Sequence, residues 1–179
     1  MAEKAFKICK RNLDEHTHKI RRDGQTPCII YGEFLEDPIS AKIENSELLK
    51  LFKENTPGSI IPLDVDGKVM NCVIKEIQKD NLGKVIHLDF QFVKQNEVIK
   101  MKIPVKFIGE SNIESRNLVF EICNPTLEFH GNVEKIPEEI EVDVSDMKFE
   151  DKVLAKDICV PEGVELITNP DTILAVVNA

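Results

Sequence analysis

Basic side chains crowd the N-terminal end of this 179-residue sequence, and they are the first groups with an evident chemistry. The first 23 positions hold seven Lys and Arg residues against four Asp and Glu residues, and they include three of the chain's four arginines. From this basic cluster we single out Arg11, Lys19, Arg21 and Arg22. Because arginine presents a planar fork of donors, such a cluster suits phosphate oxygens and base edges. A solvated basic helix is the alternative interpretation.

Three further residues are of types that RNA-binding surfaces use. Tyr31 is the only tyrosine and there is no tryptophan, so this one ring holds much of the capacity to stack on a base. His87 and Asp89 alternate with apolar residues, which places them on one strand face about 6.5–7 Å apart. Phosphate repels a carboxylate there, unless the carboxylate accepts from a base amino group such as guanine offers in the RNA minor groove. An ordinary solvated strand face explains the same spacing.

The remaining reactive residues indicate neither an enzyme nor a metal site. The cysteines are Cys9, Cys28, Cys72, Cys123 and Cys159. Their odd number and wide spacing predict free thiols in a reducing cytoplasm, not a disulfide framework or a zinc knuckle. His16-Thr17-His18 lacks the further ligands of a zinc site. Because the common phosphate-binding and nucleophile motifs are also missing, we expect no catalysis, no cofactor and no metal.

Alternation of apolar and polar residues dominates the chain and predicts a mainly β protein. The strand that holds His87 and Asp89 is expected over 85–92, and another clear strand over 97–107. Further strands are expected at 5–10, 28–31, 39–43, 59–65, 68–78, 118–123, 126–130, 139–144, 152–158 and 172–177.

Helices and turns are expected mainly in the first half of the chain. Asp14 is the candidate N-cap of a helix over 15–22, and Asn45 is the candidate N-cap of a helix over 46–54. Asp66-Gly67 separates two apolar runs and predicts a type I′ hairpin.

Charge divides the chain into two parts. Residues 1–95 hold 15 Lys and Arg against 15 Asp and Glu, whereas residues 96–179 hold 8 against 17, so the formal charge of −9 belongs to the second part. We predict one domain over residues 1–94 and an acidic domain over 95–179. No run approaches the roughly 20 apolar residues of a membrane helix, and the N-terminus lacks the features of a secretory signal. We therefore expect a cytoplasmic protein without a membrane partner.

The order of the motifs resembles a known family. Arg11 and Arg21-Arg22 precede Gly24-x-x-Pro27-x-x-x-Tyr31-Gly32, and His87-x-Asp89-Phe90 follows. This order is similar to that of the bacterial large-subunit ribosomal protein family number twenty-five, which binds 5S rRNA. The second half resembles the long two-domain form, also called the CTC or general stress protein form. The segments that carry this second resemblance are 102–105, 107–111, Ile136-Pro137, 141–145 and 157–164.

The resemblance implies a fold and a set of contacts. It implies a small closed β-barrel with two or three short helices, followed by a mainly β domain that short family members lack. The barrel would dock on the loop E region of 5S rRNA through a widened minor groove. The family's contacting residues map to Arg11, Arg21, Tyr31, His87 and Asp89. Lys19 supplies part of the charge where the family commonly has Gly-Lys and further arginines, and helix phase determines whether Arg21 or Arg22 makes the main contact.

These observations predict a structural, non-catalytic constituent of the large ribosomal subunit. Its partners would be 5S rRNA and, through the acidic domain, neighbouring ribosomal proteins. The alternative is a stress-related protein-interaction adaptor that acts off the ribosome, which the acidic second domain and the family's stress-associated name favour. Saturable binding to 5S rRNA at physiological salt would separate these two hypotheses.

Overall fold

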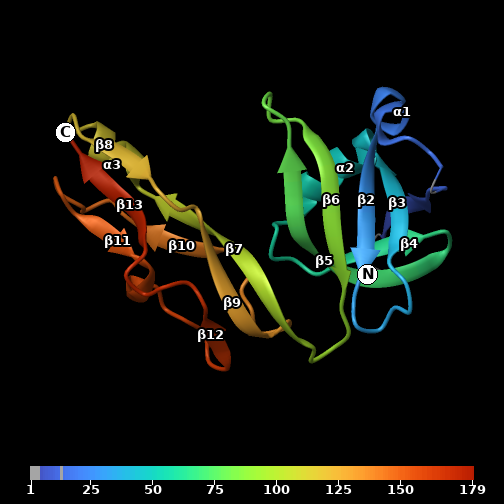
Figure 1. Cartoon of the computed structure of the whole chain (residues 1–179). Helices are drawn as coiled ribbons and strands as arrows, with labels where there is room; N and C mark the ends of the chain where they lie inside the picture. The colour runs from blue at the N-terminus through green and yellow to red at the C-terminus, as the bar shows by residue number, and fades with distance from the viewer. Residues whose placement is uncertain (1–4, 13) are drawn as a thin grey trace. The chain divides into compact units, whose positions relative to one another are not determined.

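The computed structural model describes residues 5–12 and 14–179, which form two compact β-rich units (Figure 1). The N-terminal unit ends at Gln95, and the C-terminal unit covers Asn96–Ala179. The prediction had placed this boundary between residues 94 and 95. No helix in the described part of the chain is long and apolar enough to cross a membrane.

A closed barrel of six strands forms the N-terminal unit, which confirms the predicted architecture. In spatial order its strands are β1 (Phe6–Lys10), β3 (Ile39–Glu44), β2 (Gln25–Tyr31), β6 (Val85–Phe92), β5 (Lys68–Lys79) and β4 (Ile61–Val65). The parallel pairing of β1 with β4 closes the barrel, and β2 also runs parallel to β6. Because the barrel is closed, alternate side chains of every strand point into one interior.

The apolar residues that alternate with polar ones along each strand fill the barrel interior. Ile30, Leu88 and Phe90 are fully buried, and the helix α2 (Asn45–Glu54) adds Leu48 and Leu51 to the same core. Each such side chain contributes about 1.5–3 kcal/mol through burial. The polar residues between them, including His87 and Asp89, therefore face outward from the barrel.

The type I′ hairpin is confirmed at Asp66-Gly67. Both residues have positive φ, 52° and 89°, as this turn requires. The Asp64 carboxylate accepts a hydrogen bond from the Gly67 N–H at 2.7 Å, which closes the turn between β4 and β5.

The two predicted helix caps are wrong. The first helix, α1 (Thr17–Arg22), begins after His16, because Asp14 lies in a turn closed by the hydrogen bond from the Glu15 N–H to the Asn12 carbonyl. The second helix, α2, begins one residue early, with Glu44 at its N-cap position. Asn45 instead accepts a hydrogen bond from the buried Thr26 hydroxyl at 2.9 Å. Its side chain thus ties α2 to β2.

Two sheets make up the C-terminal unit. The four-stranded sheet has the order β10 (Ile140–Asp143), β7 (Val98–Ile108), β9 (Thr126–Asn132) and β12 (Val164–Leu166). The three-stranded sheet has the order β11 (Lys152–Leu154), β13 (Ile173–Asn178) and β8 (Val119–Ile122). Along β7, burial alternates as predicted, with Met101, Ile103 and Phe107 among the residues that pack inward.

Three details of this unit differ from the expectation. The short helix α3 (Glu110–Glu114) and the strand β12 had not been predicted. The run 152–158 is a strand only as far as Leu154 and continues as the 3₁₀ turn η1 (Ala155–Asp157). The Asp157 carboxylate accepts from the Leu154 N–H at 2.9 Å, so a local side-chain hydrogen bond replaces the next strand pairing.

Candidate nucleic-acid interface

The outer face of β2 and β6 brings most of the predicted site residues together. In their parallel register Ile29 is paired with Asp89, and Tyr31 is paired with Gln91. Because paired residues of neighbouring strands point to the same side, Tyr31 and Asp89 share one face of the barrel. We call this outer surface of β2 and β6, with Arg21 of α1 beside it, the RNA face, because it holds most of the residues that the sequence predicts to contact RNA.

His87 and Asp89 form a direct contact on the RNA face. The His87 Nδ1 lies 2.8 Å from the Asp89 Oδ1, and both side chains are about one quarter exposed, at 23% and 24%. With the proton on Nδ1, the imidazole donates to the carboxylate and its Nε2 is left for a ligand. The pair thus presents acceptor groups at defined positions on this face.

Tyr31 presents a protonated hydroxyl on the same face. Burial raises its pKa above the usual 10.0, and the negative charges of Asp89 and Glu76 raise it further. The phenol therefore stays neutral at physiological pH and is a hydrogen-bond donor with a partly exposed ring. This combination suits stacking on a base or donation to a sugar or phosphate oxygen.

Arg21 is anchored beside this face by its own side chain. Its Nε donates to the Ile86 carbonyl at 3.0 Å, next to His87 in β6. The helix α1, which packs on β2, sets this position (Figure 1). One donor of the guanidinium is used, and the structure assigns no protein partner to its terminal amino groups among the described residues. These groups retain the geometry that recognises phosphate or a base edge.

Arg22 and Lys19 are placed differently. Both side chains are exposed in the last turn of α1, without a hydrogen bond or ion pair to the residues that the structure describes. Near a helix C-terminus such cations also complement the helix dipole, which is a structural role independent of RNA. The structure thus distinguishes Arg21 from Arg22 by the attachment of the Arg21 side chain to β6.

Arg11 lies at the end of β1, and the two strands β3 and β2 separate β1 from the strand β6 that holds the His87–Asp89 pair. Its backbone N–H donates to the Ser40 carbonyl at 3.0 Å, and its Nη1 donates to the Glu15 carbonyl at 3.4 Å. Its Nε is buried without a hydrogen-bond partner in the described residues. Part of this guanidinium therefore positions the loop before α1, while the side chain as a whole stays partly exposed.

Several polar residues of the same surface were not singled out from the sequence. In the register of β5 and β6, Glu76 is paired with Asp89 and Gln78 with His87. On the adjoining β3, Lys42 forms an ion pair with Glu15 at 2.7 Å, which offsets one of the carboxylates in the basic cluster. Strand alternation could have placed each of them outward, but no local signal indicates which strands are neighbours.

No metal centre occurs in the described part of the chain. No group of three or more His, Cys, Asp or Glu side chains there could hold an ion. His16 lines an open hollow with Asp14 and Glu15, but Lys19 and Lys42 line the same hollow, and Lys42 pairs with Glu15. Cys28 and Cys72 are buried in the barrel, and burial raises the pKa of each thiol to about 12, so neither is an activated nucleophile.

Comparison with known proteins identifies the family. Residues 7–90 match the Ribosomal L25p family, and residues 98–179 match the family described as Ribosomal protein TL5, C-terminal domain. Curated relatives align with almost the whole chain. The large ribosomal subunit protein bL25 of Thermoanaerobacter sp. (strain X514) is 36% identical and aligns over 100% of this chain and 90% of its own length. The chain belongs to the ribosomal L25p family.

Other bL25 proteins give the same result. The protein of Desulfitobacterium hafniense is 33% identical, with 99% of this chain and 98% of the relative covered. The protein of Thermotoga petrophila is 30% identical, with 87% of this chain and 76% of the relative covered. The resemblance of this L25p family member to the ribosomal family is therefore confirmed.

Proposed function

We propose that this L25p family member is a structural constituent of the large ribosomal subunit and binds 5S rRNA through the RNA face. The observation that carries the proposal is the anchored Arg21. Its Nε bond to Ile86 holds a cationic fork beside the His87–Asp89 pair, on the barrel surface that also presents Tyr31. An anchored guanidinium loses little rotamer freedom when RNA binds, which favours affinity.

The mechanism is recognition without chemistry. Arg21 and its basic neighbours displace counterions from phosphates, and this term makes affinity depend on salt. Tyr31, His87 and Asp89 then fix the register by contacting sugars and base edges. Asp89 suits a guanine amino group, which an RNA helix presents in its minor groove. A widened minor groove such as that expected for loop E would admit these short side chains.

Charge favours the N-terminal unit over the C-terminal unit as the RNA-binding part. Residues 96–179 carry 17 Asp and Glu against 8 Lys and Arg. Phosphates are repelled by such a surface at distances up to a Debye length, about 8 Å at physiological salt. We therefore assign 5S rRNA to the barrel and other partners to the acidic unit.

Filter binding of the full chain to 5S rRNA tests this proposal, with three arginine variants compared at the same salt concentration. Arg21→Ala should weaken binding about 5- to 150-fold, the equivalent of about 1–3 kcal/mol, and should reduce the salt slope by about one. Arg22→Ala should have a smaller effect. Arg116→Ala is the matched control, because Arg116 donates to the Asn112 and Ser145 carbonyls in the C-terminal unit.

Two results would contradict the proposal. Absence of saturable binding at physiological salt would favour the off-ribosome adaptor. Equal losses for Arg21→Ala and Arg116→Ala would mean that binding follows net charge and not the RNA face. A fragment that contains only loop E should compete with whole 5S rRNA, and failure to compete would place the contact elsewhere on that RNA.

A further inference from the structure

Among the residues that the structure describes, the strand β10 of the C-terminal unit has a strand partner along one edge, and its other edge is open. It is the first strand of the four-stranded sheet, and its strand partner is β7, with which it runs parallel. The Val144 N–H donates to the Ile108 carbonyl at 2.9 Å, so the backbone groups of Val144 point toward β7. Because backbone groups alternate along a strand, those of Val142 point the same way, and those of Glu141 and Asp143 point to the open edge.

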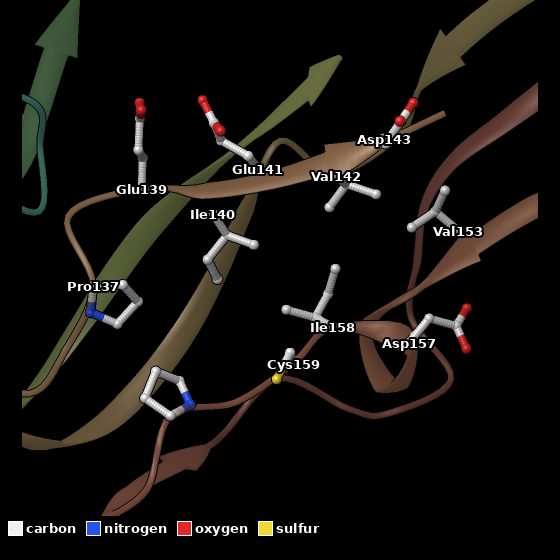
Figure 2. Close-up of a pocket in the computed structure, with 11 residues that line it drawn as sticks. Pro137, Glu139, Ile140, Glu141, Val142, Asp143, Val153, Asp157, Ile158 and Cys159 are labelled. Atoms are coloured by element: carbon white, nitrogen blue, oxygen red, sulfur yellow. The ribbon is translucent and has the colours of Figure 1, made fainter. Parts of the chain in front are cut away.

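A groove follows this open edge. It has a volume of about 440 Å³ and lies between β10 and the segment 157–161 (Figure 2). Figure 2 shows the side chains of Ile140 and Val142 on the side of β10 that faces Ile158 and Val153. Pro137 and Pro161 also line the groove. The groove therefore has an apolar floor next to unpaired main-chain groups, the combination that added strands use in peptide recognition.

The opposite face of β10 is acidic. Figure 2 shows Glu139, Glu141 and Asp143 projecting together from that face. Lys106 pairs with Glu141 at 2.8 Å and with Glu139 at 3.6 Å, so one cation is shared between two carboxylates. The Asp143 carboxylate accepts from both the N–H and the hydroxyl of Ser145, which lowers its pKa and keeps it ionised. The edge thus retains negative charge.

These features select among possible occupants of the groove. RNA is disfavoured, because its phosphates would approach the carboxylates of β10. A second copy of this chain is disfavoured too, because edge-to-edge pairing of two β10 strands would bring like charges opposite one another. A polypeptide with cationic side chains has the complementary charge.

We propose that the open edge of β10 binds an extended, lysine- or arginine-rich segment of another protein as an added strand. Its backbone pairs with the N–H and C=O groups of Glu141 and Asp143. Alternate side chains of the segment then lie on opposite faces: the apolar ones contact Ile140, Val142 and Ile158, and the basic ones meet the carboxylates. The four residues of β10 span about 13 Å, which suits a core of about four to six residues.

Hydrogen exchange of the full chain tests the added strand directly, without any substitution and without 5S rRNA. The probe is a synthetic peptide of alternating valine and lysine, about six residues long. Its binding should slow exchange of the Glu141 and Asp143 amides by about tenfold or more. The Val142 amide already faces β7 and should change much less. A peptide with glutamate in place of every lysine is the control and should give no protection.

Two substitutions at one position separate charge from backbone pairing. Glu141→Gln removes the carboxylate and keeps the N–H, whereas Glu141→Pro removes both. Proline is tolerated at an edge strand where the N–H faces away from the neighbour, so pairing with β7 should persist. Glu141→Pro should bind the lysine peptide about three- to tenfold more weakly than Glu141→Gln, as expected for one lost hydrogen bond.

Several outcomes would overturn the proposal. One is protection of the Glu141 and Asp143 amides by both peptides. Another is protection by neither peptide, which would mean that the acidic residues only prevent pairing at this edge. Another is protection of Glu141 and Asp143 that depends on protein concentration alone, which would assign the edge to a second copy. Displacement of the peptide by an RNA that itself protects these amides would assign it to nucleic acid. Because no assay here uses 5S rRNA, failure of this inference is distinct from failure of the proposed function.

Discussion

Replacing Asp89 by Asn distinguishes base recognition from simple charge attraction. Base recognition predicts weaker binding to RNA after the substitution, whereas charge attraction predicts binding that is equally tight or tighter. Asp89 accepts from His87 at 2.8 Å and lies on the RNA face in register with Ile29 of β2. Asparagine has nearly the same shape and retains one carbonyl oxygen. The substitution therefore removes a charge and an acceptor with little change in packing.

The expected change in RNA affinity depends on two opposing contributions, a lost hydrogen bond and a relieved repulsion between Asp89 and phosphate. A hydrogen bond from a base amino group to a carboxylate contributes about 1.5–3 kcal/mol. Removal of the repulsion from phosphate makes the binding free energy more favourable by about 1 kcal/mol or less at a partly exposed site, where the dielectric constant is high. The difference of about 0.5–2 kcal/mol corresponds to binding that is roughly 2- to 30-fold weaker in Asp89→Asn.

The assay is a titration of 5S rRNA with the full chain at physiological salt. Glu76→Gln is the matched control, because Glu76 is paired with Asp89 across β5 and β6 but is exposed. This control removes an equal charge nearby, and its binding should be unchanged or slightly tighter. Circular dichroism of both variants checks that the barrel is intact.

A particular result would refute the base-recognition reasoning. If Asp89→Asn bound as tightly as the unsubstituted chain or more tightly, in parallel with Glu76→Gln, the carboxylate would act only through its charge. Asp89 would then be an ordinary solvated residue of a strand that faces RNA.

Four further predictions concern the barrel itself. Asp89→Asn should lower the pKa of Tyr31 but leave it above 10.0, because burial is the largest cause of the raised pKa. Ultraviolet titration measures this pKa directly, since the chain has one tyrosine and no tryptophan. Phe90→Ala should lower the free energy of unfolding by about 3–5 kcal/mol in urea, because the ring is fully buried, and a loss below about 1 kcal/mol would contradict that packing. Cys28 and Cys72 should resist iodoacetamide at pH 8 while the exposed cysteines react, which mass spectrometry measures. Because folding raises both thiol pKa values from 9.0 to about 12, the unfolded thiols ionise first, so their contribution to stability should decline as pH rises through this interval.

The positions of most strands in this chain were predictable from the sequence, whereas the residues at which the helices begin were not. The alternation around Leu88 and Phe90 depends on a local period of two, and the hairpin at Asp66-Gly67 depends on two residues with positive φ. Asn45 has the chemistry of an N-cap, but the buried Thr26 hydroxyl competes for its side chain. Such competition arises from a residue far away in sequence, and propensity does not include it.

The candidate site also has features that were predictable from the sequence and features that were not. Tyr31, His87 and Asp89 were identified from residue type and motif order, and their outward direction follows from alternation. That Tyr31 and Asp89 are neighbours depends on the parallel pairing of β2 with β6. The open edge of β10 was likewise not predictable, because strand order is not a property of the strand's own residues.

The sequence by itself determined the inward and outward faces of the strands, the supply of cationic and aromatic groups, and the acidic character of the second half. These are local properties, because side-chain direction repeats every two residues and charge is additive along a chain. Only the tertiary structure distinguishes Arg21 from Arg22, because the Arg21 Nε donates to the Ile86 carbonyl. This difference depends on how α1 packs on β2, and packing between distant segments arises only when the barrel closes.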